Sequence, residues 1–181
     1  MIDAVQLERR LKSLGRPRVL IVGDLIMDRY VIGDVERISP EAPIPVLAAR
    51  SSELRLGGAG NVAANLRSMD AQVQVIGVVG DDALGRTMRE RFEGIGADAD
   101  DLITDSGRPT IEKTRMLSGV QQMLRVDWED TRPLAGEALE HLLTAAKTSL
   151  AVADVVVLSD YGKGTLPDEA LRVILRLASE R

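Results

Sequence analysis

The sequence predicts an α/β fold with a doubly wound, mainly parallel sheet and a small β lid. Three short apolar runs, at residues 18–24, 73–80 and 153–160, are rich in β-branched residues, as is typical of strands in the middle of a parallel sheet. Stretches of helical periodicity alternate with these runs, which indicates a parallel sheet covered by helices. A proline-rich segment at residues 30–47 differs in texture and is expected to stand off that sheet.

The composition limits the class of protein. With 181 residues, of which 45% are hydrophobic, the chain is one domain that can bury a core without staples. A net charge of −5, no long basic run and 2% aromatic residues argue against a nucleic-acid partner. The lack of cysteine excludes disulfides and a thiolate nucleophile and fits a reducing compartment. Because the N-terminus lacks a signal-peptide core and no apolar run approaches about 18 residues, we expect a soluble cytoplasmic protein.

The first fifty residues are expected to form a helix, a buried strand and part of the lid. Val5, Leu7, Leu11 and Leu14 fall on one helical face, and the strand at residues 18–24 follows after a Gly and a Pro. Beyond it, two strand-like pieces, YVIGDV and IPVLAA, flank a segment with three prolines. Since proline lacks an N–H donor and belongs at sheet edges, we expect a small exposed sheet here.

The middle of the chain is expected to add two helices and a hairpin. A helix begins in the glycine-rich segment RLGGAGNVAANLRSM, and a second helix follows Asp82. Two strands, TIEKTRMLS and QQMLRVDWE, meet at Ser118 and Gly119 as a hairpin. We therefore place the lid segments at about residues 30–50 and 109–128.

The last third is expected to form helix, strand and helix. Residues 134–150 have helical periodicity, the third apolar run follows, and Pro167 suits the first position of a final helix. That helix finishes at Arg181 with no strand after it. We therefore expect a sheet that is incomplete at the C-terminus.

Polar residues follow the predicted strands at three places, and ligands of open parallel sheets bind beyond the carboxyl ends of their strands. Asp24 and Asp28 follow the first strand, and Asp160 with Lys163 follows the third. Asp28 can accept hydrogen bonds from two neighbouring sugar hydroxyls, or it can cap a turn. Asp24 can share that site or simply close the strand.

The glycine-rich segment offers a second part of the same site. Gly57, Gly58 and Gly60 let the backbone approach a ligand closely before the helix begins. Asn61 supplies a donor and an acceptor to a hydroxyl-rich ligand, and Asn65 lies one turn further along. The alternative is a structural turn with a capping Asn.

A dinucleotide site is a rival interpretation of the same glycines. GAGNVA matches the fingerprint G-x-G-x-x-A, but the preceding SSELRL is half polar and does not read as a buried strand. Asp81 and Asp82, about twenty residues on, follow a Gly instead of ending a strand. The match is therefore weak.

Several basic side chains could contact an anion. Lys163 lies between glycines and could bind phosphate, or be a surface Lys in a flexible turn. Lys113 and Arg115 share one strand face and could clasp an anionic group of the substrate, or form a solvated stripe opposite Glu112 and Glu129. One His, expected on a helix surface, and no Cys predict no transition-metal site.

The proline-rich segment carries the lid candidates Arg37, Ser39 and Glu41. It could equally be an interaction strand that pairs with a second subunit, and both can hold together.

Three segments, VGDLIMDRYVIG, LGGAGNVAANLRSM and VVLSDYGKGTL, in this order resemble the ribokinase-like sugar kinases. ERISPEAPIPV and KTRMLSGVQQMLRVDWED narrow the resemblance to the bacterial heptose 7-phosphate kinases. That activity occurs alone or as the first half of a bifunctional enzyme that also makes ADP-heptose for lipopolysaccharide. The resemblance covers essentially the whole chain.

The resemblance implies roles for matching residues. Asp28 and Asn61 would hold sugar hydroxyls, with Gly57 and Gly58 lining the pocket and Asp160 near the substrate. The segment through Pro45 would be the lid, and lid strands that pair between subunits imply a homodimer.

The resemblance also implies ATP and Mg²⁺ as cofactors, but the family's Asn-x-x-Glu and Gly-Ala-Gly-Asp motifs do not occur in the chain. We therefore expect the chain to be the N-terminal part of a kinase domain, with most of the ATP site missing. The predicted activity is ATP-dependent phosphorylation of D-glycero-β-D-manno-heptose 7-phosphate at O1. The alternative is a non-catalytic sugar-phosphate-binding or dimerisation module.

Overall fold

A parallel sheet of three strands lies at the centre of the body, in the order β4-β1-β9. The structure is a computed structural model that describes residues 3, 6, 13 and 15–180, so the helix expected on Val5 to Leu14 lies outside the described residues. The strands are β1 (Arg18–Gly23), β4 (Gln72–Ile76) and β9 (Val155–Ser159). They coincide with the three apolar runs that predicted a parallel sheet.

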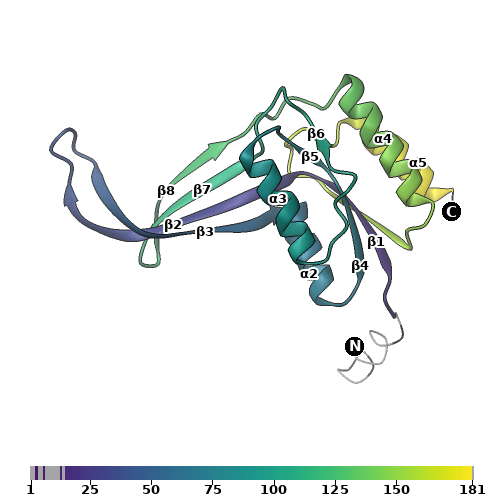
Figure 1. Cartoon of the computed structure of the whole chain (residues 1–181), viewed down its shortest axis with the longest axis horizontal. Coiled ribbons are helices and arrows are strands. Elements are labelled where there is room, and N and C mark those ends of the chain that lie inside the picture. The colour runs from purple at the N-terminus through teal and green to yellow at the C-terminus, as the bar shows by residue number, and fades with distance from the viewer. Residues whose placement is uncertain (1–2, 4–5, 7–12, 14, 181) are drawn as a thin grey trace.

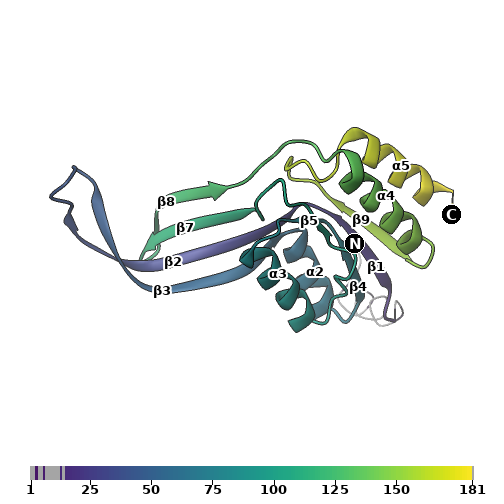
Figure 2. The same cartoon turned by 45° about the horizontal axis from the view of Figure 1, so that its top comes forward.

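Helices cover both faces of this sheet, as the predicted doubly wound fold requires (Figure 2). Alternate β1 side chains point to opposite faces, so Val19 and Ile21 join one core cluster while Leu20 and Val22 join the other. The first cluster packs under α2 (Ala59–Ser68) and α3 (Ala83–Gly94), and the second under α4 (Gly136–Leu150) and α5 (Asp168–Ser179). None of the described helices is long and apolar enough to cross a membrane.

The apolar run at residues 73–80 forms two strands instead of one. β4 ends at Ile76, and β5 (Val78–Val79) pairs with β6 (Ile103–Thr104) in a separate small parallel sheet. Gly77 makes the break possible, because a Cβ there would lie 2.6 Å from the Leu25 side chain and 2.7 Å from the Gly23 carbonyl oxygen. The prediction of one continuous strand was wrong at this point.

The third apolar run is less buried than predicted. Within the described residues β9 pairs with β1 alone, which makes it an edge strand. Val155 is 49% exposed, and the next three residues are only partly buried. Apolar composition identified the strand correctly but could not tell an edge from the middle of a sheet.

The two predicted lid segments lie in a four-stranded sheet that extends away from the body as an arm (Figure 1). Its order is β3-β2-β7-β8, with β2 (Leu25–Ile38), β3 (Pro45–Gly58), β7 (Glu112–Ser118) and β8 (Gln121–Trp128). β2 and β3 have 14 residues each, so both strands are longer than the short pieces predicted. β2 follows β1 after a single residue, Asp24, so the arm is rooted at the carboxyl end of the central strand.

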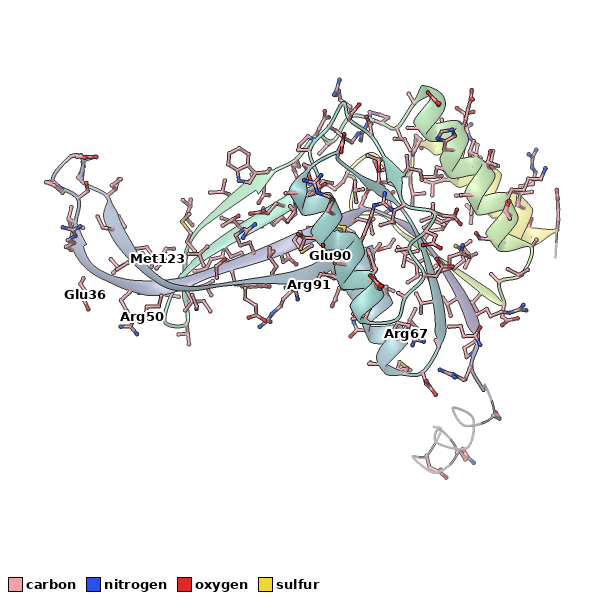
Figure 3. All side chains as sticks on the ribbon, in the orientation of Figure 1. Glu36, Arg50, Arg67, Glu90, Arg91 and Met123 are labelled. Carbon is pink, nitrogen blue, oxygen red and sulfur yellow. The ribbon has the colours of Figure 1, made fainter. Side chains whose placement is uncertain are left out.

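The end of the β2–β3 hairpin projects beyond the β7–β8 hairpin. Figure 3 shows Glu36 and Arg50 on this projecting part, farther from the body than Met123 of β8. Register shifts after Ile32 and Val35 bend the arm, as bulges do in antiparallel pairs. The loop is closed by the Ser39 N–H, which donates to the Ile44 carbonyl at 2.8 Å.

Candidate functional site

A cavity of about 480 Å³ opens where the arm joins the body. β2, β3, α2, β7, β8 and the loop after β9 all contribute to its wall. Six of the predicted substrate residues line it, namely Asp28, Gly57, Gly58, Asn61, Lys113 and Arg115. Residues separated by almost ninety positions in the sequence therefore meet in one place.

Strand register explains how the arm gathers these side chains. Directly paired residues lie on the same sheet face, and that face repeats every second residue. In one row across the four strands, Arg55, Asp28, Lys113 and Asp127 are neighbours. In the next row the neighbours are Glu53, Tyr30, Arg115 and Arg125. The face is thus a small grid of opposite charges around one aromatic ring.

Asp28 is paired with Arg115 at the centre of this grid. Arg115 Nη1 donates to Asp28 Oδ1 at 2.5 Å, and both side chains are about four-fifths buried. The hydrogen bond to Asp28 raises the pKa of the Arg115 guanidinium, against the opposing effect of burial. The other carboxylate oxygen, Oδ2, lies against Gly57, where a Cβ would clash with it.

Tyr30 contacts two guanidinium groups. The Cζ atoms of Arg55 and Arg115 lie 5.1 and 5.4 Å from the ring centroid, within the range of cation–π attraction. Arg55 also donates to both Glu53 carboxylate oxygens, at 2.9 and 2.8 Å. The ring therefore contacts two of the basic side chains that line the cavity.

A second charged cluster lies around Glu129. Its Oε1 accepts from Lys163 Nζ at 2.8 Å and its Oε2 from Lys113 Nζ at 3.3 Å. The hydrogen bond from Lys163 lowers the pKa of Glu129, and the contribution of Lys113 adds to it against burial. Lys163 is thus held by a carboxylate outside the cavity wall, while Lys113 also contacts Asp127 at 2.8 Å. Lys113 bonds Glu129 directly and is 13% exposed, so it is not part of the solvated stripe that was the alternative interpretation.

Asp24 is buried and serves as an anchor. None of it is exposed, and its carboxylate accepts from the backbone N–H groups of Tyr161, Lys163 and Thr165 at 2.7, 3.0 and 3.2 Å. These bonds compensate a buried charge and fix the loop that follows β9. Of the two alternatives for Asp24, the structure favours the one in which it closes the strand.

Asp160 and Asn65 lie outside the cavity wall. Asp160 is exposed and accepts from the Gly162 N–H at 2.8 Å, and the residue after it, Tyr161, lines the cavity in its place. Asn65 is exposed on α2. Asn61 reaches the cavity and does not cap α2, whose N-cap is Gly58 with φ of 54° and no side-chain capping bond.

The lid candidates lie at the far end of the arm. Arg37, Ser39, Glu41 and Pro45 are at or beside the loop of the β2–β3 hairpin, and the described residues that line the cavity do not include them. Ser39 Oγ accepts from the Glu41 N–H at 3.1 Å, which stabilises the loop locally. The part of the arm that faces the cavity is instead the inner half of β2, β3, β7 and β8.

Four residues of the wall were missed by the sequence analysis. Tyr30, Arg55, Arg125 and Tyr161 line the cavity, and although each lies in a segment quoted above, none was named as a site residue. Their signal was the two-residue alternation along the lid strands, with Tyr30 two residues after Asp28 and Arg55 two before Gly57. That signal becomes usable only once the pairing of distant strands is known.

The dinucleotide interpretation and the metal can both be tested on the geometry. The glycine loop enters α2 from β3, an antiparallel strand of the arm, and not from a parallel strand as the fingerprint requires.

In the part of the chain that the structure describes, no group of three or more acidic or His side chains could hold a metal ion. The described residues therefore do not form a cage of three or more protein ligands for Mg²⁺. His141 lies on the surface of α4, as predicted.

Comparison with known proteins gives a consistent result. The family model described as pfkB family carbohydrate kinase matches residues 16–181. The bifunctional protein HldE of Wolinella succinogenes is 42% identical over 168 residues, which cover 93% of this chain and 35% of that protein. HldE of Caulobacter vibrioides is 48% identical over 161 residues, covering 89% and 33%. The chain thus spans about a third of the length of these curated relatives.

Solved structures with the same fold are also carbohydrate kinases. A carbohydrate kinase from Agrobacterium tumefaciens superposes with a TM-score of 0.69 at 21% identity, covering 91% of this chain and 50% of that one. Arabidopsis thaliana ribokinase, complexed with ribose and ATP, gives a TM-score of 0.63 at 20% identity, covering 91% and 51%. At these identities the likeness establishes the fold, which is ribokinase-like.

Proposed function

Because the chain belongs to the pfkB family of carbohydrate kinases, we propose that it supplies the substrate site of an ATP-dependent sugar-phosphate kinase. The proposed substrate is D-glycero-β-D-manno-heptose 7-phosphate, phosphorylated at O1, as in the formation of ADP-heptose for lipopolysaccharide. The kinship with HldE proteins and the two lid segments quoted above support this choice of sugar.

The observation that carries the proposal is the charge of the cavity wall. Its ionisable side chains include one acid, Asp28, and four bases, Arg55, Lys113, Arg115 and Arg125. A neutral sugar could use Asp28, Asn61 and the backbone at Gly57, but it would make no use of the four basic side chains in the wall. A sugar phosphate satisfies both parts, since guanidinium forks bind phosphate through paired hydrogen bonds.

In the reaction, these residues would bind and orient the substrate. Asp28 and Asn61 would hold hydroxyls of the ring, and the arginines would fix the phosphate at the other end of the sugar. A substrate held at two points keeps its reacting hydroxyl in one orientation, and phosphoryl transfer depends mainly on such positioning. ATP would donate its γ-phosphoryl group, and the arm would limit access of water to the cavity.

Isothermal titration calorimetry of the purified chain with heptose 7-phosphate and with ATP tests the proposal. We expect heptose 7-phosphate to bind and Asp28→Asn to weaken that binding at least about tenfold, because charge-assisted hydrogen bonds to the hydroxyls are lost. Asp34→Asn is the matched control, since Asp34 lies on the same strand but pairs with Arg50 away from the cavity. Binding of sugar phosphate without ATP would favour the non-catalytic module, and no binding of the sugar phosphate would contradict the proposal.

We also propose a homodimer formed through the arm and a cytoplasmic location, where ATP is supplied. Ile38 and Ile44, near the end of the arm, are 61% and 56% exposed, and exposed apolar side chains on a projecting element are typical of an interaction surface. A symmetric pair of arms would cover both residues.

A further inference from the structure

We infer that Arg115 couples recognition of the phosphate to recognition of the sugar hydroxyls. In the free site the Arg115 guanidinium is hydrogen-bonded to the Asp28 carboxylate. The phosphate of the incoming substrate attracts Arg115 and makes the carboxylate available to the sugar hydroxyls. The inference rests on the proposed function and adds a selection mechanism to it.

The first step is the state of Asp28 in the free site. Oδ1 accepts the 2.5 Å hydrogen bond from Arg115, and Oδ2 lies against the backbone at Gly57. One carboxylate oxygen therefore already has a charged donor, and the other is crowded by the backbone at Gly57. A pair of sugar hydroxyls must compete with the guanidinium for Asp28.

The second step is that Arg115 differs from the other bases of the wall. Arg55 is held by Glu53, and Arg125 by Asp127 at 2.8 Å, and neither of these acids lines the cavity. Arg115 is held by Asp28, the one acid that does. An anion that attracts Arg115 therefore makes Asp28 available to sugar hydroxyls. An anion at Arg55 or Arg125 leaves the Asp28–Arg115 pair intact.

The third step is where Arg115 can go. Its Cζ is already 5.4 Å from the Tyr30 ring centroid, on a ring that Arg55 approaches to 5.1 Å. A phosphate that binds Arg115 would replace its interaction with Asp28 by a stronger one with a dianion. Arg115 can therefore leave Asp28 and keep its contact with the Tyr30 ring.

The consequence is positive coupling between an anion and a polyol in one cavity. A neutral sugar must compete with Arg115 for Asp28, while a sugar phosphate removes this competitor itself. By linkage, phosphate and neutral sugar added separately must strengthen each other's binding.

The coupling is measured by calorimetry on the full chain with three probes, namely heptose 7-phosphate, the unphosphorylated heptose and inorganic phosphate. We expect saturating inorganic phosphate to tighten binding of the unphosphorylated heptose roughly fivefold or more, the lower range of typical coupling. Arg115→Met should tighten binding of the unphosphorylated heptose by a similar factor without phosphate, abolish the phosphate effect and weaken binding of heptose 7-phosphate. If inorganic phosphate binds without this coupling, the affinity for the unphosphorylated heptose should not change.

Arg125→Met is the matched control, because Arg125 faces Arg115 across β7 and β8 and lines the same cavity. This variant should bind heptose 7-phosphate more weakly than the wild type and should bind the unphosphorylated heptose no more tightly. An Arg115→Met protein that unfolds normally yet binds the neutral sugar no better than wild type overturns the coupling. Inorganic phosphate that leaves neutral-sugar binding to the wild type unchanged or weaker overturns it without any variant. A wild type that does not bind heptose 7-phosphate would instead overturn the proposed function.

Discussion

Substitution of Asp24 is expected to be the largest single perturbation of the framework that supports the site. Its carboxylate accepts from one buried N–H, of Thr165, and from two partly buried ones, of Tyr161 and Lys163. Asp24→Ala would leave the buried donor without a partner, at a cost of about 1–3 kcal/mol, and would weaken the other two by about 1 kcal/mol each. We therefore expect the free energy of unfolding to fall by about 3–5 kcal/mol. Asp24→Asn keeps one acceptor oxygen and should cost about half as much.

Urea unfolding followed by circular dichroism measures this loss, since a change in midpoint at constant slope reports stability. Asp160→Ala is the matched control in the same loop, because its exposed carboxylate accepts one bond, from Gly162, and should cost less than about 1 kcal/mol. A loss below about 1 kcal/mol for Asp24→Ala, or equal losses for Asp24→Ala and Asp160→Ala, would refute the reasoning that the buried carboxylate holds the loop.

Three further predictions follow from the same contacts. Gly57→Ala places a Cβ against Asp28 Oδ2, so calorimetry should show sugar-phosphate affinity reduced at least about tenfold with little change in thermal unfolding, and unchanged affinity would argue against Asp28 as a ligand. Burial raises the pKa of Asp82, but hydrogen bonds from Thr110 and Gly85 outweigh it and lower the pKa, so the carboxylate stabilises the fold above about pH 4 and loses this effect as the pH falls. Urea unfolding should show Asp82→Asn about 1 kcal/mol less stable than wild type at pH 7, with the difference shrinking below about pH 4, and a constant difference would contradict this. Replacing Ile38 and Ile44 with Ser should shift the proposed dimer towards monomer in analytical ultracentrifugation, while Ile32→Ser at the inner half of the arm serves as a comparison.

The main elements of the fold could be predicted because their signals are local. β1, α2, α3 and the β7–β8 hairpin lie where periodicity and turn residues placed them, and Asp82 caps α3 through the Gly85 N–H at 2.7 Å. What the sequence could not supply is context. Val155 has the composition of a buried strand residue, and only its position at a sheet edge makes it half exposed.

The site divides in the same way. Asp28 and Asn61 could be found because strand ends and glycine loops are recognisable in a single segment. Tyr30, Arg55 and Arg125 could not, since each acquires its place through pairing with a strand far away in the sequence. Asp24 was ambiguous because a carboxylate one residue beyond a strand looks the same whether it faces a ligand or three backbone amides.

A crystal structure of the chain with heptose 7-phosphate tests the central claim most directly. The account predicts sugar hydroxyls within hydrogen-bond distance of Asp28 and Asn61, the phosphate between Arg55 and Arg115, and Arg115 withdrawn from Asp28. A sugar phosphate bound elsewhere on the chain, or one in the cavity with its phosphate turned away from the arginines, would contradict it.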